Sequence, residues 1–154
     1  MLRVVRTLRL FSDEGKSVAI YYIDSYGSDT ELLVRGIAKT VSLAKASKLS
    51  QAAVAAHDKR QVSGSNIWEE AIGKAATKSL GAGRVIINGC TFHLLTGRID
   101  PAGFIRGPIL AAAIATKFLE KVIKNRKAAD VVFVPWTPEE LEEFKRNHPD
   151  AISF

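Results

Sequence analysis

Two residues of this 154-residue chain stand out for their chemistry: Cys90, its only cysteine, and His93, three positions later. A thiol acts as a nucleophile through its thiolate, which a nearby cation or protonated histidine stabilises. His93 or a nearby arginine would therefore activate Cys90. An inert cysteine packed in the core is the alternative, because cysteine is among the most frequently buried residue types. Residue type alone leaves both interpretations open.

The residues just before Cys90 are compatible with two local structures. An apolar run at 85–87 leads into Asn88 and Gly89. An Asn-Gly pair between apolar segments is a strong signal for a tight β-hairpin, in which Cys90 would open the second strand. Alternatively, residues 84–87 form a strand of a parallel sheet, and Cys90 lies in the loop at its carboxyl end.

A second group of small and polar residues follows the apolar segment 17–24. It lies where a helix is expected to begin, and the main-chain N–H groups and dipole of a helix start attract anions. The candidate anion-binding residues are Asp24, Ser25, Gly27, Ser28 and Thr30. A polar turn with a helix cap explains the same residues without any ligand.

The third feature is an excess of positive charge, because 22 Lys and Arg residues outnumber 16 Asp and Glu residues. A net charge of +6 favours a polyanionic or acidic partner. The candidate nucleic-acid-binding residues are Lys117, Lys121, Lys124, Arg126 and Lys127. No motif of a known nucleic-acid-binding module accompanies them, so a solvated helix face is the simpler explanation.

Other classes of function find little support. The three histidines are scattered without ligand spacing, so we expect no metal site and no cofactor. A single cysteine excludes an intramolecular disulfide, which fits the reducing cytoplasm. Arginines at positions 3, 6 and 9 interrupt any secretory signal, and the longest apolar stretch, 108–115, is too short for a membrane span. We therefore expect a cytoplasmic protein without a membrane partner.

The elements that must position these residues alternate between strand and helix. Strands are predicted from apolar or alternating patterns at 2–11, 17–24, 51–57, 130–136 and 152–154, with a hairpin connection at 13–15. Helices are predicted from capping residues and helical periodicity at 28–48, 66–80, 107–122 and 137–147. The third of these would begin at Gly107 and Pro108, since proline suits the first helical position.

These elements predict a single α/β domain over residues 1–154. It would be a three-layer sandwich, with a mostly parallel sheet of about five strands and helices on both faces. Ligands of such sheets bind at the carboxyl ends of the strands. The residues expected at this edge are Asp24, Ser25, His57, Asp58 and Cys90.

Residues 83–134 resemble the C-terminal half of the DsrE/DsrF/TusD family of sulfur-relay proteins. The likeness lies in the apolar strand and cysteine of 84–90, the small-residue segment 106–113 and the strand 129–133. The opening strand 17–24 and its helix are similar to the first βα unit of that family. The resemblance implies that Cys90 carries a persulfide and passes it between a sulfur-donor protein and a sulfur-acceptor protein.

Two hypotheses about function follow from the sequence. The first is a cytoplasmic sulfur-relay protein that carries the persulfide on Cys90, with His93 or an arginine stabilising the thiolate. The alternative is a non-enzymatic module that binds nucleic acid through the basic helix at 117–127. Self-association would cover exposed apolar helix surface in so small a domain, so a homo-oligomer is expected in either case.

Overall fold

The computed structural model describes residues 18–154. Its strands are β1 (Ala19–Tyr22), β2 (Gln51–Ala55), β3 (Arg84–Ile87), β4 (Cys90–Leu95), β5 (Gly107–Ala112), β6 (Ala128–Val134) and β7 (Ile152–Ser153). Its helices are α2 (Thr30–Lys45), α3 (Arg60–Ser63), α4 (Asn66–Ile72), α5 (Lys74–Gly81), α6 (Thr116–Ile123) and α7 (Pro138–Asn147). The predicted strand at 2–11 and the hairpin at 13–15 lie outside the described residues.

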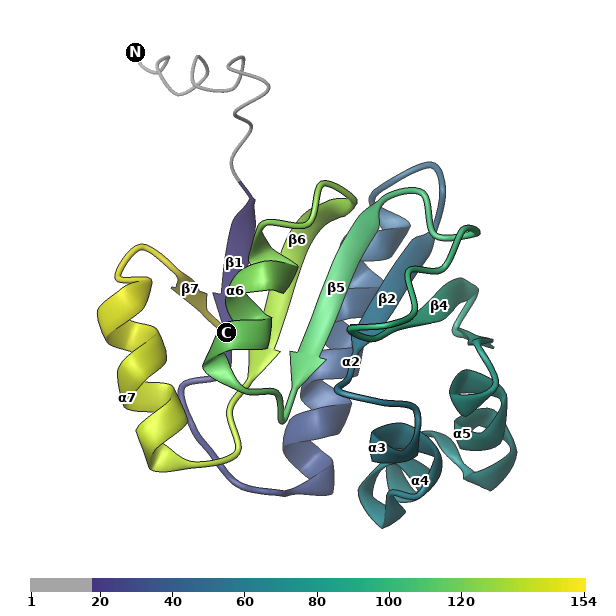
Figure 1. Cartoon of the computed structure of the whole chain (residues 1–154), viewed down its shortest axis with the longest axis horizontal. Helices are drawn as coiled ribbons and strands as arrows, with labels where there is room; N and C mark the ends of the chain where they lie inside the picture. Colours follow the sequence, from purple (N-terminus) through teal and green to yellow (C-terminus); the bar gives the residue numbers. More distant parts are fainter. Residues whose placement is uncertain (1–17) are drawn as a thin grey trace.

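The strands form one sheet in the order β3-β4-β2-β5-β6-β1-β7 (Figure 1). Every neighbouring pair is parallel except β3 and β4, which are antiparallel. The sheet therefore has seven strands where the sequence predicted about five. The difference arises chiefly because residues 107–112, predicted as the start of a helix, form a strand, and because residues 90–95, for which the sequence left a loop and a hairpin strand open, form another.

Helices cover both faces of the sheet, which confirms the predicted α/β class with helices on both faces. Buried side chains of α2, α3, α4 and α5 pack into one core cluster, which includes Val62 and Trp68. Leu119 of α6 and Phe144 of α7 belong to the cluster on the opposite face. In Figure 1, α6 lies in front of the sheet and α2 behind it.

The two longest helices begin close to their predicted starts, with the cap of α2 one residue after the predicted start at 28 and the cap of α7 at the predicted Thr137. Asp29 precedes α2, and its side chain accepts a hydrogen bond from the N–H of Glu31. Thr137 caps α7 in the same way through the N–H of Glu140, with Pro138 in the first helical position. The predicted helix at 66–80 is instead two helices. Gly73 separates them with a φ of 93°, a conformation that glycine adopts without steric cost.

The expected helix start at Gly107 and Pro108 is wrong, because these residues open the central strand β5. A Cβ atom on Gly107 would lie 2.1 Å from the main-chain oxygen of Gln51. Glycine therefore allows β5 to approach β2 closely, and the missing N–H of Pro108 falls at an irregularity in the pairing with β6. Every residue of β5 is buried, as expected for a strand covered on both faces.

Residues 88 and 89 form the tight turn of a β-hairpin, which resolves the choice that the sequence left open. Asn88 has a φ of 50° and Gly89 a φ of 83°. Positive φ values at both central positions are those of the hairpin turn that Asn-Gly pairs favour. Ile87 and Cys90 face each other across this turn, so Cys90 is the first residue of β4.

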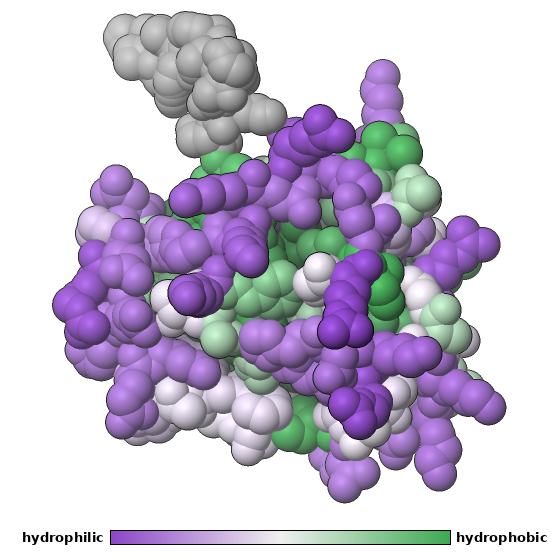
Figure 2. Space-filling view, viewed as in Figure 1, coloured by the Kyte–Doolittle hydropathy of each residue, from purple (hydrophilic) through white to green (hydrophobic). Residues whose placement is uncertain are grey.

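The face that carries α6 and α7 is largely hydrophilic (Figure 2). Apolar residues show there only as small, separate areas between polar side chains. Such scattered apolar residues are ordinary on a protein surface. This face therefore offers no continuous apolar area for self-association, and the homo-oligomer stays a prediction. None of the helices described in residues 18–154 has the length and apolar character needed to cross a bilayer.

Candidate functional site at the carboxyl ends of β2 and β5

The chain leaves two neighbouring parallel strands, β2 and β5, toward opposite faces of the sheet. From β2 it continues into α3, whose Val62 packs in the core on one face. From β5 it continues into α6, whose Leu119 packs in the core on the other face. Connections that diverge in this way leave a crevice at the carboxyl edge, which is where open α/β sheets bind their ligands.

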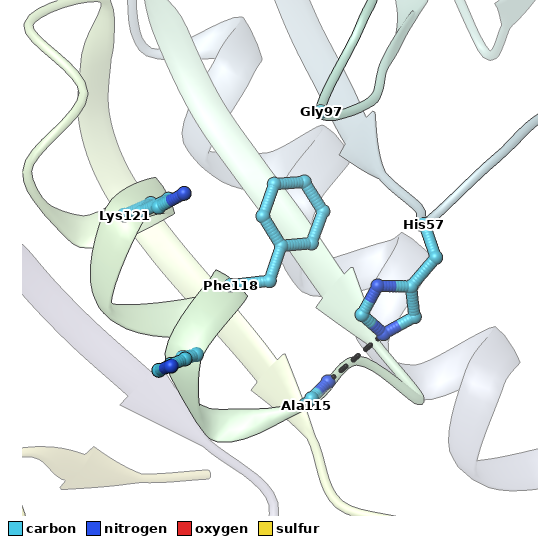
Figure 3. A pocket seen from close by; sticks show the side chains of 6 residues that line it. His57, Gly97, Ala115, Phe118 and Lys121 are labelled. Atoms are coloured by element: carbon cyan, nitrogen blue, oxygen red, sulfur yellow. Dashed lines mark hydrogen bonds between the residues drawn. The ribbon is translucent and has the colours of Figure 1, made fainter.

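A surface pocket of about 220 Å³ lies at this edge, on the α6 side of the sheet (Figure 3). Its lining residues come from the ends of β2, β4 and β5 and from α6: His57, Gly97, Ala115, Lys117, Phe118 and Lys121. The pocket is open to solvent and small, so it fits one compact chemical group better than a whole large ligand.

The imidazole of His57 is held in place by contacts with the start of α6. Its Nε2 accepts a hydrogen bond of 3.1 Å from the main-chain N–H of Ala115. Its ring packs against that of Phe118, with 5.4 Å between the centroids and 35° between the planes. Figure 3 shows this hydrogen bond and the ring of His57 turned toward Phe118 and the pocket.

Gln61 joins the two loops that form the crevice. Its Oε1 accepts a hydrogen bond from the N–H of His57 at 2.6 Å. Its Nε2 donates to the main-chain oxygen of Ala113 at 2.7 Å. Ala113 has a φ of 58°, which is uncommon for a residue with a Cβ atom. One side chain thus fixes both the position of His57 and the turn that leads from β5 into α6.

The polar groups of the pocket favour an anion. Lys117 and Lys121 are exposed and one helical turn apart on α6, so their ammonium groups can reach the same ligand. At the start of α6, His57 accepts the N–H of Ala115, and no side chain among the described residues accepts an N–H of residues 116–118. The hydroxyl of Thr116, the first residue of α6, donates a hydrogen bond of 2.8 Å to the carboxylate of Glu143. The six lining residues include no carboxylate, and the nearby Asp58 lies 3.6 Å from the guanidinium of Arg60.

The structure places Cys90 elsewhere, and its expected position at the carboxyl edge is wrong. Cys90 opens β4, so it lies at the amino edge of the sheet and is fully buried. Its Sγ lies 3.8 Å from the main-chain oxygen of Val41 in α2. Burial raises the pKa of the Cys90 thiol above its ordinary value of 9.0, and Lys45 offsets this only in part. These surroundings favour the interpretation of Cys90 as an inert cysteine packed in the core.

The expected partnership of His93 with Cys90 is also wrong. Successive residues of a strand point to opposite faces, so residues three apart lie on different sides of the sheet. Cys90 packs in the cluster beneath α2, whereas the ring of His93 lies 5.9 Å from that of Phe104, in the other cluster. Burial, with Arg84 and Lys127, lowers the pKa of His93, so this histidine is no source of positive charge for the thiolate.

The anion-binding turn predicted after β1 makes its contacts within the protein. Asp24 forms an ion pair of 2.8 Å with Lys145. Thr30 donates a hydrogen bond to Glu70, and Asp29 accepts one from the first turn of α2. Ser25, Gly27 and Ser28 lie in the same turn, where Gly27 has a φ of 138°. Carboxylates already occupy this helix start, which favours the interpretation as a capped turn.

The basic residues predicted for nucleic acid differ in their surroundings. Lys117 and Lys121 lie in α6 at the pocket, and Lys124 follows the helix as its C-terminal cap. Lys127 is instead bound by Asp100 at 2.9 Å and by the main-chain oxygen of Pro101. Arg126 is exposed beyond the helix end. Binding of nucleic acid by the whole set stays a prediction.

Sequence reasoning placed His57 at the carboxyl edge but missed the residues that meet it there. Gln61, Ala113, Ala115 and Phe118 carry no motif. A usable signal did exist in the fully apolar run 108–115, which is also the pattern of a strand buried on both faces. Taken as a strand, it would have placed residues 113–116 beside His57.

The geometry defines an α/β protein with a donor-rich pocket at a point where neighbouring connections diverge. Comparisons of the chain with protein-family models, curated proteins and solved structures give no match. The described residues also contain no cluster of three or more His, Cys, Asp or Glu side chains arranged for a metal ion.

Proposed function

We propose that the protein binds a phosphorylated small molecule, with its phosphate group in the pocket between β2, β5 and α6. The observation that carries this proposal is the convergence of Lys117, Lys121 and His57 on one hollow at the carboxyl edge. A phosphate group matches several donors and two positive charges at once. The rest of the ligand would extend over Gly97 or into solvent, since the pocket holds only a compact group.

Burial of Cys90 does not favour the sulfur-relay hypothesis, because a persulfide carrier needs a thiolate that its partners can reach. The anion pocket also accounts for two of the five basic residues assigned to nucleic acid. A nucleic-acid module would instead use the exposed basic residues together, with little preference for those that line the pocket.

The experiment is a titration of the protein with pyrophosphate, followed by calorimetry and by the shifts of main-chain amide resonances. We expect saturable binding, with the largest shifts at residues 57 and 115–118. Replacing both lysines with alanine (K117A/K121A) should weaken binding by about tenfold or more, because each charge-assisted hydrogen bond contributes roughly 1.5–3 kcal/mol.

The matched control is Lys124→Ala with Arg126→Ala, which removes the same charge outside the pocket. This variant should retain pyrophosphate affinity within about twofold, because exposed distant charges are screened. Equal weakening by the two double variants would contradict a defined pocket and favour general attraction of polyanions. The nucleic-acid hypothesis is tested by comparing the affinity of the control variant and of the unmodified protein for single-stranded RNA. A nucleic-acid module should lose RNA affinity in the control variant, whereas a phosphate pocket should not.

A further inference from the structure

His57 has one ring nitrogen engaged and one directed to the pocket. Because the N–H of Ala115 donates to Nε2, this nitrogen has no proton of its own. The neutral imidazole must then carry its proton on Nδ1. Figure 3 shows Nδ1 on the side of the ring that faces Phe118 and the pocket. Among residues 18–154, Nδ1 has no hydrogen-bond partner in the structure.

The tautomer is held by contacts from both sides of the crevice. Gln61 accepts the main-chain N–H of His57 and donates to Ala113, so it ties the backbone of His57 to the turn before α6. Packing against Phe118 restricts rotation of the His57 ring about its Cβ–Cγ bond. Turning the ring to present Nε2 to the pocket would break the bond to Ala115 and leave that N–H without its acceptor.

We infer that His57 is a specificity-determining residue that donates its Nδ1–H to the ligand, an inference that rests on the proposed function. The remaining polar groups at the pocket, the ammonium groups of Lys117 and Lys121, are donors as well. A ligand group that only accepts hydrogen bonds satisfies all three. The site therefore selects a fully ionised phosphate, as in a phosphate monoester or a diphosphate, over a group that must donate a proton.

The first test reads the tautomer without any ligand. Long-range ¹H–¹⁵N correlation spectra at pH 8 distinguish a protonated ring nitrogen from an unprotonated one. We expect the spectrum of His57 to show the proton on Nδ1 and the lone pair on Nε2. A proton on Nε2 of His57 would overturn the inference, whatever the protein binds.

The second test separates the two ring nitrogens with a matched pair of variants. In His57→Gln the amide oxygen can replace Nε2 as the acceptor for Ala115, but nothing replaces the donor. In His57→Asn the amide nitrogen can replace the Nδ1–H donor, but the acceptor is lost. We expect H57Q to weaken pyrophosphate binding by about tenfold, the effect of one hydrogen bond to an anion, and H57N to weaken it less.

Three results of the second test would be decisive. Equal pyrophosphate affinities of H57Q and the parent, with α6 amide resonances unchanged, would overturn the inference and leave the proposed function standing. A larger loss in H57N than in H57Q would do the same, because it would show that capping of α6 matters and donation does not. Absence of any binding to the parent protein would overturn both.

Discussion

The two ends of the parallel strands differ in what they offer a partner molecule. At the carboxyl edge, β2 and β5 diverge into opposite helical layers, and His57, Lys117 and Lys121 surround an open pocket. At the amino edge, the start of β4 lies beneath α2, and Cys90 is fully buried there. Cys90, the candidate nucleophile of the sequence, is buried, whereas residues without a motif form the accessible site.

This difference shows that chemical type decides less than the direction in which the chain leaves each strand. A loop that turns away from its neighbour exposes polar groups on both sides of a crevice. A hairpin that starts a strand beneath a helix instead buries its first side chain.

The largest expected effect concerns the reactivity of Cys90. Because the thiol is buried and its pKa is raised, native protein should react with an alkylating reagent about a thousandfold or more slowly than protein in denaturant. Mass spectrometry of timed samples measures both rates, and Cys90→Ala supplies the unreactive control. Alkylation of native protein within minutes at neutral pH would remove the contrast between the two edges and restore the sulfur-relay hypothesis.

The next effect concerns the pairing of β2 with β5, which brings the two sides of the pocket together. Gly107→Ala would place a Cβ atom 2.1 Å from the main-chain oxygen of Gln51. Because backbone must move to relieve this overlap, the free energy of unfolding should fall by about 3 kcal/mol or more. Denaturant unfolding followed by circular dichroism measures the change.

Gly97→Ala is the matched control for that substitution. Gly97 lines the pocket, but a Cβ atom there would meet no heavy atom within 4 Å. Its free energy of unfolding should therefore stay within about 0.5 kcal/mol of the parent. Parent-like stability in G107A would show that β5 does not approach β2 as the structure places it.

The smallest effect concerns His93, on the face of β4 opposite to Cys90. Burial lowers the pKa of His93 in the folded protein below its ordinary value of 6.5. The unfolded chain therefore binds more protons between this lowered pKa and 6.5, so stability falls as the pH drops below 6.5. Asp130, whose pKa burial raises above 3.8, has the opposite effect in more acidic solution.

Unfolding measured between pH 7.5 and 5.5 in the parent and in His93→Phe isolates this contribution. The parent should lose stability relative to the variant as the pH falls, because only the parent has this titrating group. Parallel stability curves for the two proteins would show that His93 titrates in the folded protein as it does in the unfolded chain. In that case the His93 face of β4 would not exclude charge as the Cys90 face does.

Several elements could be predicted because their signals are local. Asp29 and Thr137 mark the starts of α2 and α7 through hydrogen bonds that span three residues or fewer. The apolar, β-branched segment 130–136 contains most of β6, whose side chains are largely buried. The helix predicted at 107–122 was wrong in its first half, since an apolar run after Gly-Pro suits a helix start and a buried strand alike, and α6 begins only at Thr116.

The candidate site was harder to predict, because it depends on contacts between distant residues. His57 meets Ala115 across 58 positions, and Gln61 meets Ala113 across 52. The sequence around these four residues contains no pattern that predicts the contacts. Only the placement of β5 beside β2 brings them together.

The sequence by itself determined the α/β class, the capped helices and the Asn-Gly hairpin signal, because these depend on side chains near in the chain. The tertiary structure decided the strand order, the edge at which each strand ends and therefore the exposure of Cys90 and His57. Strand order is set by packing between segments far apart in sequence. The apolar pattern of one strand does not reveal which of its ends lies at the open edge of the sheet. The assembly of the sheet therefore decides that Cys90 is buried and that His57 lines an open pocket.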